Sequence, residues 1–97
     1  YYVSGTGTII MTGTGSITGG YFSINFTINT SGTITMPTTF SYGGVSSNPL
    51  WTGGGGVFTY TSGTVITTNS TLVLPYSIST QATTINSGSI VWNNVTF

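Results

Sequence analysis

The sequence predicts an all-β protein: a single β-sandwich of about seven strands, of the Ig-like or jelly-roll type, with an extended N-terminal strand. Thr, Ile, Val, Tyr and Phe, which favour strands, are abundant in the 97 residues, whereas residues that favour helices are scarce. Short segments of alternating polar and apolar residues are also separated by glycine-rich turns. The length suits one domain, and an aromatic content of 13% argues against disorder.

Apolar residues occupy every second position in three segments that we expect to be strands. The clearest is residues 20–28, where every even position from 22 onwards is apolar and the residues between them are mostly polar. Residues 71–79 and 89–97 alternate in a similar way, although Pro75 indicates an edge strand or a bulge. Shorter candidate strands cover four further ranges: Thr33–Met36, Thr39–Tyr42, Val57–Thr61 and Thr64–Thr67.

A short motif, [ST]-Gly-[ST]-[IV], recurs five times along the chain. Its glycine permits a positive φ, and the following Ser or Thr opens a strand whose second residue faces inward. We therefore interpret the motif as a repeated hairpin turn. Its glycines are 8, 17, 31 and 25 residues apart, and this lack of a fixed period disfavours a solenoid. The motif occupies residues 6–9, 14–17, 31–34, 62–65 and 87–90.

The first 17 residues alternate for longer than an ordinary strand. Between Tyr1 and Ile17 the odd positions are apolar or glycine, and the even positions are polar except for Tyr2 and Ile10. A strand usually has about 5–6 residues, whereas this segment would extend for about 55 Å at about 3.3 Å per residue. One interpretation is two ordinary strands with a bend at Gly13 or Gly15.

The other interpretation is a donor strand that leaves its own domain and inserts into the next subunit by β-strand addition. The chain then divides into a donor-strand tail at residues 1–18 and a β-sandwich head domain at residues 19–97. Because a head-to-tail contact that does not close produces an open polymer, this interpretation predicts a filament of identical subunits. The apolar side chains on the inward face of the donor strand are Val3, Ile9, Met11 and Ile17.

Six residue types are absent from the chain: Asp, Glu, Lys, Arg, His and Cys. No serine or threonine therefore has a side-chain base to activate it, so we expect neither enzymatic activity nor a small-molecule substrate. The strong ligands of metal ions are also missing, and we expect no metal and no other cofactor. A chain without cations cannot displace the counterions of nucleic acid. No apolar run exceeds three residues, so no membrane-spanning helix is expected.

Four N-glycosylation sequons lie in the predicted strands or beside them, and each acceptor asparagine falls on the polar face. Glycans at these positions would replace the missing charges as solubilising groups. The chain begins at Tyr1 without a signal-like region, which fits a secreted protein whose signal peptide has been removed and fits an artificially shortened chain equally well. The acceptors are Asn25, Asn29, Asn69 and Asn94.

The uncharged Thr-, Ser-, Gly- and Asn-rich composition, the amphipathic segment at residues 1–17 and the four sequons resemble the thread filament subunits of acidophilic archaea. The resemblance covers the whole chain in composition and layout, without a diagnostic motif. It implies a secreted, N-glycosylated β-domain whose N-terminal strand completes the next subunit of a pilus-like extracellular filament, by donor strand complementation. Such a filament would support cell adhesion or biofilm formation. Chaperone–usher pilins share the insertion principle, but their usual charges and disulfide are absent here.

Two other classes of protein fit the composition. One is a self-contained β-sandwich adhesin or lectin in which Trp51, Trp92 and the six tyrosines stack on sugars, although aromatic residues of a sandwich are more often in the core. The other is a viral capsid or surface-layer shell protein, which would also be uncharged and self-associating. An image of the assembled protein separates the three, because they form filaments, monomers and closed shells respectively.

The absence of side chains that titrate below neutral pH predicts an acid-stable protein. No side chain takes up a proton between about pH 7 and pH 2. Because stability changes with pH only where the folded and unfolded states bind different numbers of protons, the midpoint of unfolding should stay nearly constant over this range. Thermal melting of recombinant, unglycosylated protein measures this, since glycans can carry charges of their own. A melting temperature that drops steeply with acid would contradict the prediction.

Overall fold

The computed structural model of the chain describes residues 2–19, 21–43, 56–74 and 83–96. These residues form strands and turns, so the prediction of an all-β fold is confirmed. None of the described residues belongs to a helix that could cross a membrane. In chain order the strands are β1 (Tyr2–Met11), β2 (Gly15–Ser16), β3 (Tyr21–Thr35), β4 (Thr39–Tyr42), β5 (Gly56–Ile66), β6 (Thr71–Val73), β7 (Thr83–Asn86) and β8 (Asn94–Thr96).

All strand pairings within the described ranges are parallel. Across the sheet the order is β7, β5, β3, β4, β6 and β8, and both β1 and β2 also pair with β3. An Ig-like or jelly-roll sandwich is built from antiparallel strands, so the pairings correct this part of the prediction: the strands form one parallel half-barrel. Parallel neighbours cannot be joined by hairpin turns, so the recurring glycine motif has another role.

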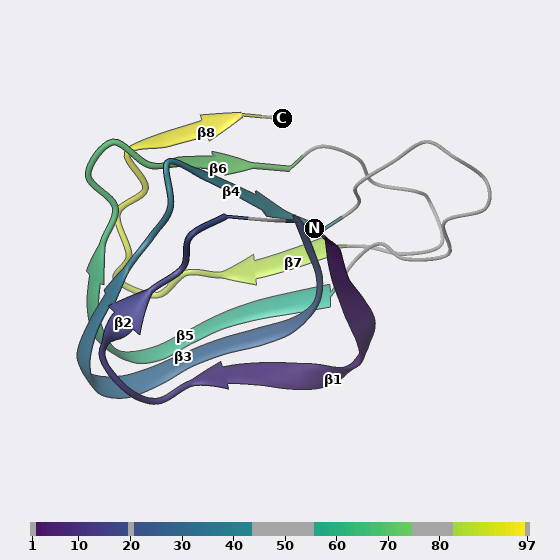
Figure 1. The fold of residues 1–97 in the computed structure, drawn as a ribbon, viewed down its shortest axis with the longest axis horizontal. Helices are drawn as coiled ribbons and strands as arrows, with labels where there is room; N and C mark the ends of the chain where they lie inside the picture. Colours follow the sequence, from purple (N-terminus) through teal and green to yellow (C-terminus); the bar gives the residue numbers. More distant parts are fainter. Residues whose placement is uncertain (1, 20, 44–55, 75–82, 97) are drawn as a thin grey trace.

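The chain winds as a spiral and returns repeatedly to the same place in the sheet. Positions 2, 21, 41, 73 and 96 are successive neighbours. In Figure 1, β1 and β7 run in one direction, whereas β4, β6 and β8 run in the opposite direction along the facing side. We name the stack of β1, β3, β5 and β7 the first wall, and the stack of β4, β6 and β8 the second wall. This is a solenoid-like arrangement, which the irregular glycine spacing argued against.

Unequal turn lengths hide this repeat from the sequence. The successive returns are 19, 20, 32 and 23 residues apart. The two longer turns include residues 44–55 and 75–82, which lie outside the described residues. Each of these connections leads from a strand of the second wall to a strand of the first wall. They therefore lengthen a turn of the spiral without changing the strands that stack.

The recurring glycine motif forms corners of the spiral. Its copies at residues 31–34 and 62–65 lie in neighbouring β3 and β5, and their last two residues pair in register, Thr33 with Thr64 and Ile34 with Val65, after an irregularity in the ladder. Gly63 in the second copy has a φ of 114°, and a Cβ there would lie 2.5 Å from the Thr30 side chain and 3.0 Å from the Thr30 carbonyl oxygen. Only glycine fits this corner, because the conformation disfavours other residues and the space is occupied.

The predicted strands agree best with the structure inside the stacked turns. β4 has the predicted bounds Thr39–Tyr42. β3 joins the clearest predicted strand, residues 20–28, to the shorter one at Thr33–Met36, and β5 joins the shorter ones at Val57–Thr61 and Thr64–Thr67, because the chain bends through a corner without leaving the sheet. β6 and β8 are shorter than predicted, and residues 75–79 are outside the described residues. The pattern does not predict β7, because Ile85 is the only apolar residue among its four and no alternation can be seen.

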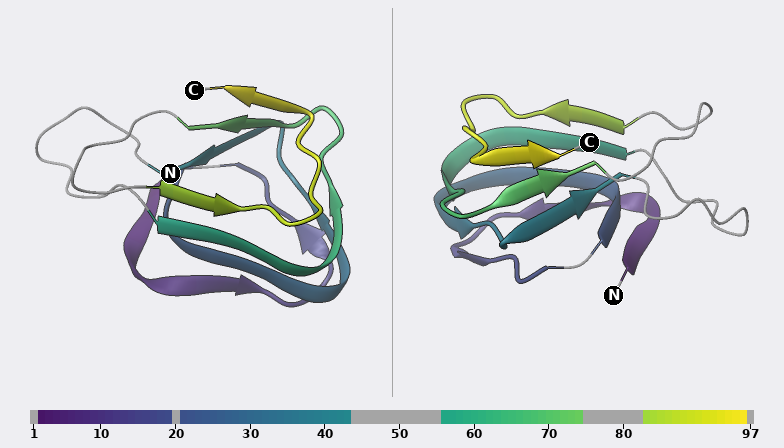
Figure 2. Two further views of the ribbon diagram at one scale, coloured as in Figure 1. Left: turned by 180° about the vertical axis from the view of Figure 1, so that it is seen from behind. Right: turned by 90° about the horizontal axis from the view of Figure 1, so that it is seen from above.

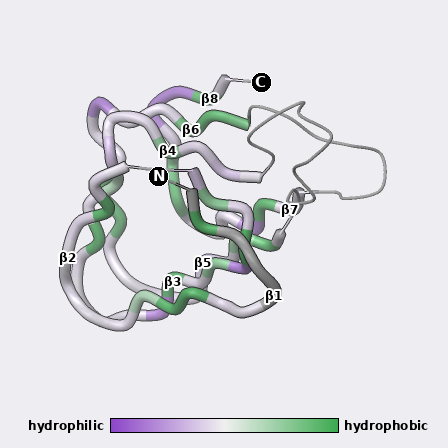
Figure 3. The backbone as a smooth tube through the Cα atoms, turned by 45° about the vertical axis from the view of Figure 1, so that its right-hand side comes forward, coloured by the Kyte–Doolittle hydropathy of each residue, from purple (hydrophilic) through white to green (hydrophobic). Residues whose placement is uncertain are grey.

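Aromatic side chains fill the space between the two walls. Along β3, apolar residues that face inward alternate with polar residues, as the colours of Figure 3 indicate. Phe40 of the second wall is fully buried, and its ring centroid lies 5.8 Å from that of Phe26 and 5.9 Å from that of Phe58. The indole of Trp92 stacks on Phe40 at 6.4 Å. We name this group the aromatic core; its members are Phe22, Phe26, Phe40, Tyr42, Phe58 and Trp92.

Truncation of Phe40 to alanine should lower the free energy of unfolding by about 3–5 kcal/mol, because it removes the ring that both walls contact. The neighbouring exposed residue provides the matched control, and Thr39→Ala should change stability by no more than about 0.5 kcal/mol. Chemical denaturation of the two variants beside the wild type measures the difference. Equal losses in both variants would show that Phe40 is not central to the core.

The buried Tyr42 predicts a loss of stability in alkali. Its hydroxyl donates a hydrogen bond to the carbonyl oxygen of Ile24, and burial raises the pKa of Tyr42 from 10.0 to about 12. Between these values the unfolded chain releases a proton that the folded chain retains, so stability should fall as pH rises from 10 to 12. Thermal melting across this window should give a shallower slope for Tyr42→Phe than for the wild type. An unchanged slope would assign the alkaline loss to other groups.

Candidate functional site

The N-terminal segment forms two strands with a bend between them. β1 ends at Met11 and β2 begins at Gly15, so the turn lies at residues 12–14, close to the bend that the two-strand interpretation places at Gly13 or Gly15. β1 lies beside β3 of its own chain, from the pair Tyr2 and Tyr21 onwards, with an irregularity between residues 4 and 8. Within this single chain the segment is thus the first turn of the spiral.

The four predicted inward residues share one face and lie against the core of their own chain. Ile17 belongs to the buried core, with an exposure of 8%, while Val3, Ile9 and Met11 are half-buried and pack against that core. This surface is therefore apolar and suited to burial. In the single chain this apolar face packs on the chain's own core, while β1 pairs with β3 through its backbone.

Hydroxyl groups hold the bend of the segment in place. The Thr30 hydroxyl donates to the carbonyl oxygens of Thr12 and Gly13, at 3.0 and 2.9 Å, and accepts a hydrogen bond from the amide of Gly32. The Thr33 amide donates to the Thr14 hydroxyl at 3.1 Å. These bonds replace the ion pairs that the chain cannot form, and they tie the first turn to the second at the corner.

Both ends of the spiral carry a sheet edge with no partner strand among the described residues. β1 pairs only with β3, β7 pairs only with β5, and β8 pairs only with β6. Figure 2 (right) shows β7 and β1 at opposite sides of the stacked first wall. Such edges present a row of unpaired backbone N–H and C=O groups to which another strand can add. The arrangement can therefore take part in β-strand addition at either end.

The last turn of the spiral exposes apolar side chains. Val91 is 80% exposed and Val95 of β8 is 44% exposed, although Val95 lies beside buried Leu72 in the ladder. At the first turn, Ile10 is 55% exposed. Stacked repeats usually end in a turn with a polar outer face, which keeps the protein soluble. Most exposed residues of both end turns are polar, but Ile10, Val91 and Val95 leave apolar side chains exposed among them.

The predicted glycosylation sites differ in accessibility. Asn29, Asn69 and Asn94 are exposed, whereas Asn25 is half-buried in β3. The Asn25 side-chain oxygen accepts a hydrogen bond from the Val57 amide at 3.1 Å. Asn69 lies in the turn before β6 with a φ of 60°. Asn25 is thus the acceptor that a glycosylating enzyme would reach least easily.

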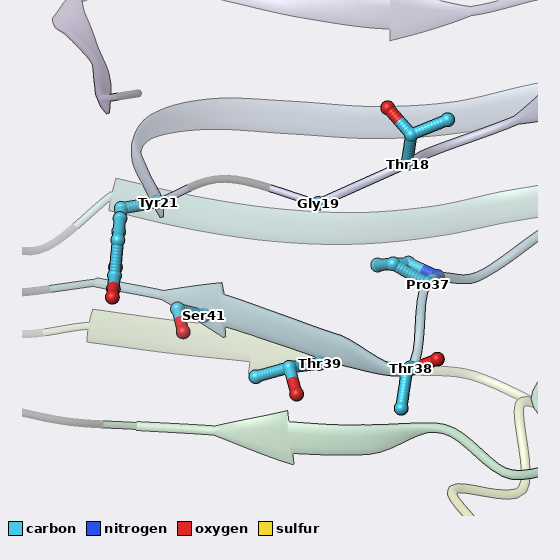
Figure 4. Close-up of a pocket in the computed structure, with 7 residues that line it drawn as sticks. All are labelled: Thr18, Gly19, Tyr21, Pro37, Thr38, Thr39 and Ser41. Atoms are coloured by element: carbon cyan, nitrogen blue, oxygen red, sulfur yellow. The ribbon is translucent and has the colours of Figure 1, made fainter.

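A hollow of about 320 Å³ lies where the first and second turns of the spiral separate. Tyr21, 47% exposed, forms one side of it, and hydroxyl groups line much of the rest (Figure 4). An aromatic ring beside hydroxyls is a surface that can bind a sugar. The sequence pattern places Tyr21 only at a strand start and gives no signal for this hollow. The lining residues are Thr18, Gly19, Tyr21, Pro37, Thr38, Thr39 and Ser41.

Trp92 does not line this hollow. Trp92 packs in the aromatic core, and its indole N–H donates to the Ser87 hydroxyl at 2.9 Å. Trp51 lies outside the described residues. No known protein family, curated protein or solved structure matches the chain. The features that bear on function are therefore the sheet edges, the N-terminal segment and the composition.

Glycan occupancy should follow the accessibility of the four acceptors. We expect glycans at Asn29, Asn69 and Asn94, and lower occupancy at Asn25, because its side chain is half-buried whereas the other three are exposed. Mass spectrometry of peptides from natively produced protein measures occupancy at each site. Unmodified peptides at all four sites would contradict the prediction and leave the solubility of an uncharged chain to be explained by other means.

Proposed function

We propose that this protein is the structural subunit of an extracellular, pilus-like filament, in which identical chains join head to tail by β-strand addition. The observation that carries the proposal is the open sheet edge at each end of the described spiral, at β1 and at β7 with β8. Exposed edges of this kind attract another strand unless they are blocked. Because the two edges lie at opposite ends, a contact between them does not close, and its product is an open polymer.

The N-terminal segment, residues 1–18, makes the joint by adding its strand to the sheet of the next subunit. Its backbone supplies a ladder of hydrogen bonds, and its apolar residues Val3, Ile9, Met11 and Ile17 supply burial beside the joint. The proposal is supported by the position of β1 at the end of the stack, where its outer edge has no partner among the described residues.

The absence of charge suits both assembly and an acidic exterior. No side chain repels a second copy of the chain. Glycans at the outward asparagines would keep the sides of the filament hydrated while the apolar ends associate. We place the filament at the cell surface of its producer, where it would support adhesion or biofilm formation.

A self-contained adhesin or lectin is a second candidate, which the hollow beside Tyr21 favours. Its exposed ring and hydroxyl lining are compatible with a neutral sugar, and the hollow does not require assembly. Electron microscopy distinguishes the candidates: filaments favour the structural subunit, monomers favour the adhesin, and closed shells favour a capsid or surface-layer protein.

Deletion of residues 1–15 should abolish filaments and leave an unstable domain, because buried Phe26 and Ile28 of β3 lose the strand beside them. A synthetic peptide of residues 1–17 should raise the melting temperature of the truncated protein again. Negative-stain microscopy and thermal melting of truncated and full-length protein test this. If the truncated protein remains a folded monomer and the full chain never polymerises, the proposal is wrong.

A further inference from the structure

We infer that the joint between subunits is an edge-to-edge stack, in which β1 stays on its own β3 and presents its outer edge to β7 of a second copy. The spiral of one chain then continues into the next, and no strand is exchanged. This inference rests on the proposed function, since it specifies how the filament subunits meet. It replaces insertion into a groove by addition at an edge that is already open.

The spiral completes a whole number of turns, which makes the two ends of the chain match. The column of neighbours that begins at Tyr2 returns four times and ends at Thr96. A second copy displaced by four strand spacings along the winding axis, without rotation, brings its Tyr2 to the place of Thr96, so the terminal residues of the two chains move apart there while the spiral continues. The β1 strand of the second copy then runs beside β7 in the same direction. Four strand spacings of about 4.8 Å give an axial displacement of about 19 Å.

The side-chain columns of the first wall continue across such a joint. An inward column contains Ile9, Phe26, Phe58 and Ile85, in that order. Its two central rings are buried, while the isoleucines at its ends are only half-buried. In the stack, Ile9 of the second copy lies beside Ile85 of the first, and each covers the other. The parallel ladder supplies the hydrogen bonds that both edges lack within the described residues.

A column of side chains on the outer face of the first wall also supports the pairing of β1 of one copy with β7 of another. It contains Ile10, Thr27, Thr59 and Asn86, in that order, and both of its end members are exposed. Exposed Val91 and Val95 lie in the same last turn and would be approached by the first turn of the second copy. A second copy of this chain is the occupant that fits, because it alone brings an edge of matching direction, matching columns and no charge.

Exchange of β1 between subunits would first have to undo existing contacts. Phe26 and Ile28 of β3, with exposures of 1% and 0%, would lose the strand beside them. The hydrogen bonds from Thr30 to the carbonyl oxygens of Thr12 and Gly13 would break as well. An edge-to-edge stack forms new contacts and keeps all of these.

A disulfide that locks β1 to its own β3 separates the two modes of assembly. Ile10 and Thr27 are direct neighbours on the outer face, so Ile10→Cys with Thr27→Cys places two thiols at a bridgeable distance in a chain that has no other cysteine. The variant is oxidised as a dilute monomer, transferred to the conditions in which the wild type polymerises, and compared with its reduced form. We expect sedimentable filaments from both forms in equal yield, with an axial repeat of about 19 Å in electron micrographs.

A second variant tests the joint itself. Ile10→Cys with Asn86→Cys should give a ladder of disulfide-linked oligomers when assembled filaments are oxidised, because these positions meet only between copies. Ile10→Cys with Thr59→Cys is the matched control and should give at least tenfold less cross-linking, since Thr59 is one strand further from the edge.

Two results would overturn the edge-to-edge stack and leave the filament standing. One is locked protein that polymerises only after reduction. The other is oxidised filaments of the variant with Ile10→Cys and Asn86→Cys that contain no cross-linked oligomers. A wild type that never polymerises overturns the proposed function itself, so the two failures are distinguishable.

Discussion

Phe40 contacts rings from both walls of the spiral, and the remaining structure depends on this contact. Its ring lies near Phe26 and Phe58 of the first wall and beneath Trp92 of the last turn. The chain has no residue that can form an ion pair or a disulfide, so apolar burial and neutral hydrogen bonds must hold it together. Each turn contributes at least one large apolar side chain to this space. The stacked parallel strands stay in register because a shift by one residue would turn those side chains outward.

Hydrogen bonds from hydroxyl groups also hold the turns of the spiral together. At the corner of the first two turns, Thr30 bonds three backbone groups, and at the second wall the Ser70 hydroxyl donates to the carbonyl oxygen of Pro37. The Thr67 hydroxyl likewise donates to the carbonyl oxygen of Val91. Threonine and serine therefore satisfy backbone groups at places where the ladder is interrupted. These three hydroxyl groups therefore have a structural role in a chain without charges.

The same spiral geometry connects stability with assembly. A parallel stack gains hydrogen bonds and apolar contacts from each added turn, and its first and last turns lack one neighbour. In this chain the end turns keep their apolar residues, such as Val95, and carry no charge that would discourage a further turn. The interactions that join β5 to β7 within one chain are therefore of the same kind as those proposed between β7 and β1 of two chains.

The sequence by itself determined which residues face inward and where most strands lie. The alternation places Val3, Ile9, Met11 and Ile17 on one face, and β4 has the bounds that its pattern predicts. The composition also determined that no charged side chain takes part in the fold or in any site, because the chain contains none. These properties are local, because they depend on residue type and on a period of two along a strand.

Tertiary structure alone decided the direction of pairing and the identity of the neighbours. A parallel sheet that is covered on both faces usually has continuous apolar strands, but this sheet curves around its own core, and most residues on its outer face are polar. Polar and apolar residues therefore alternate along its strands, as they do in an antiparallel sheet. This alternation cannot distinguish parallel from antiparallel pairing. The connections at residues 44–55 and 75–82 make the turns unequal and remove the period that would reveal a spiral. Which strand lies beside β1 and β7, and which edges stay open, depends on contacts between distant residues, and no local pattern encodes those.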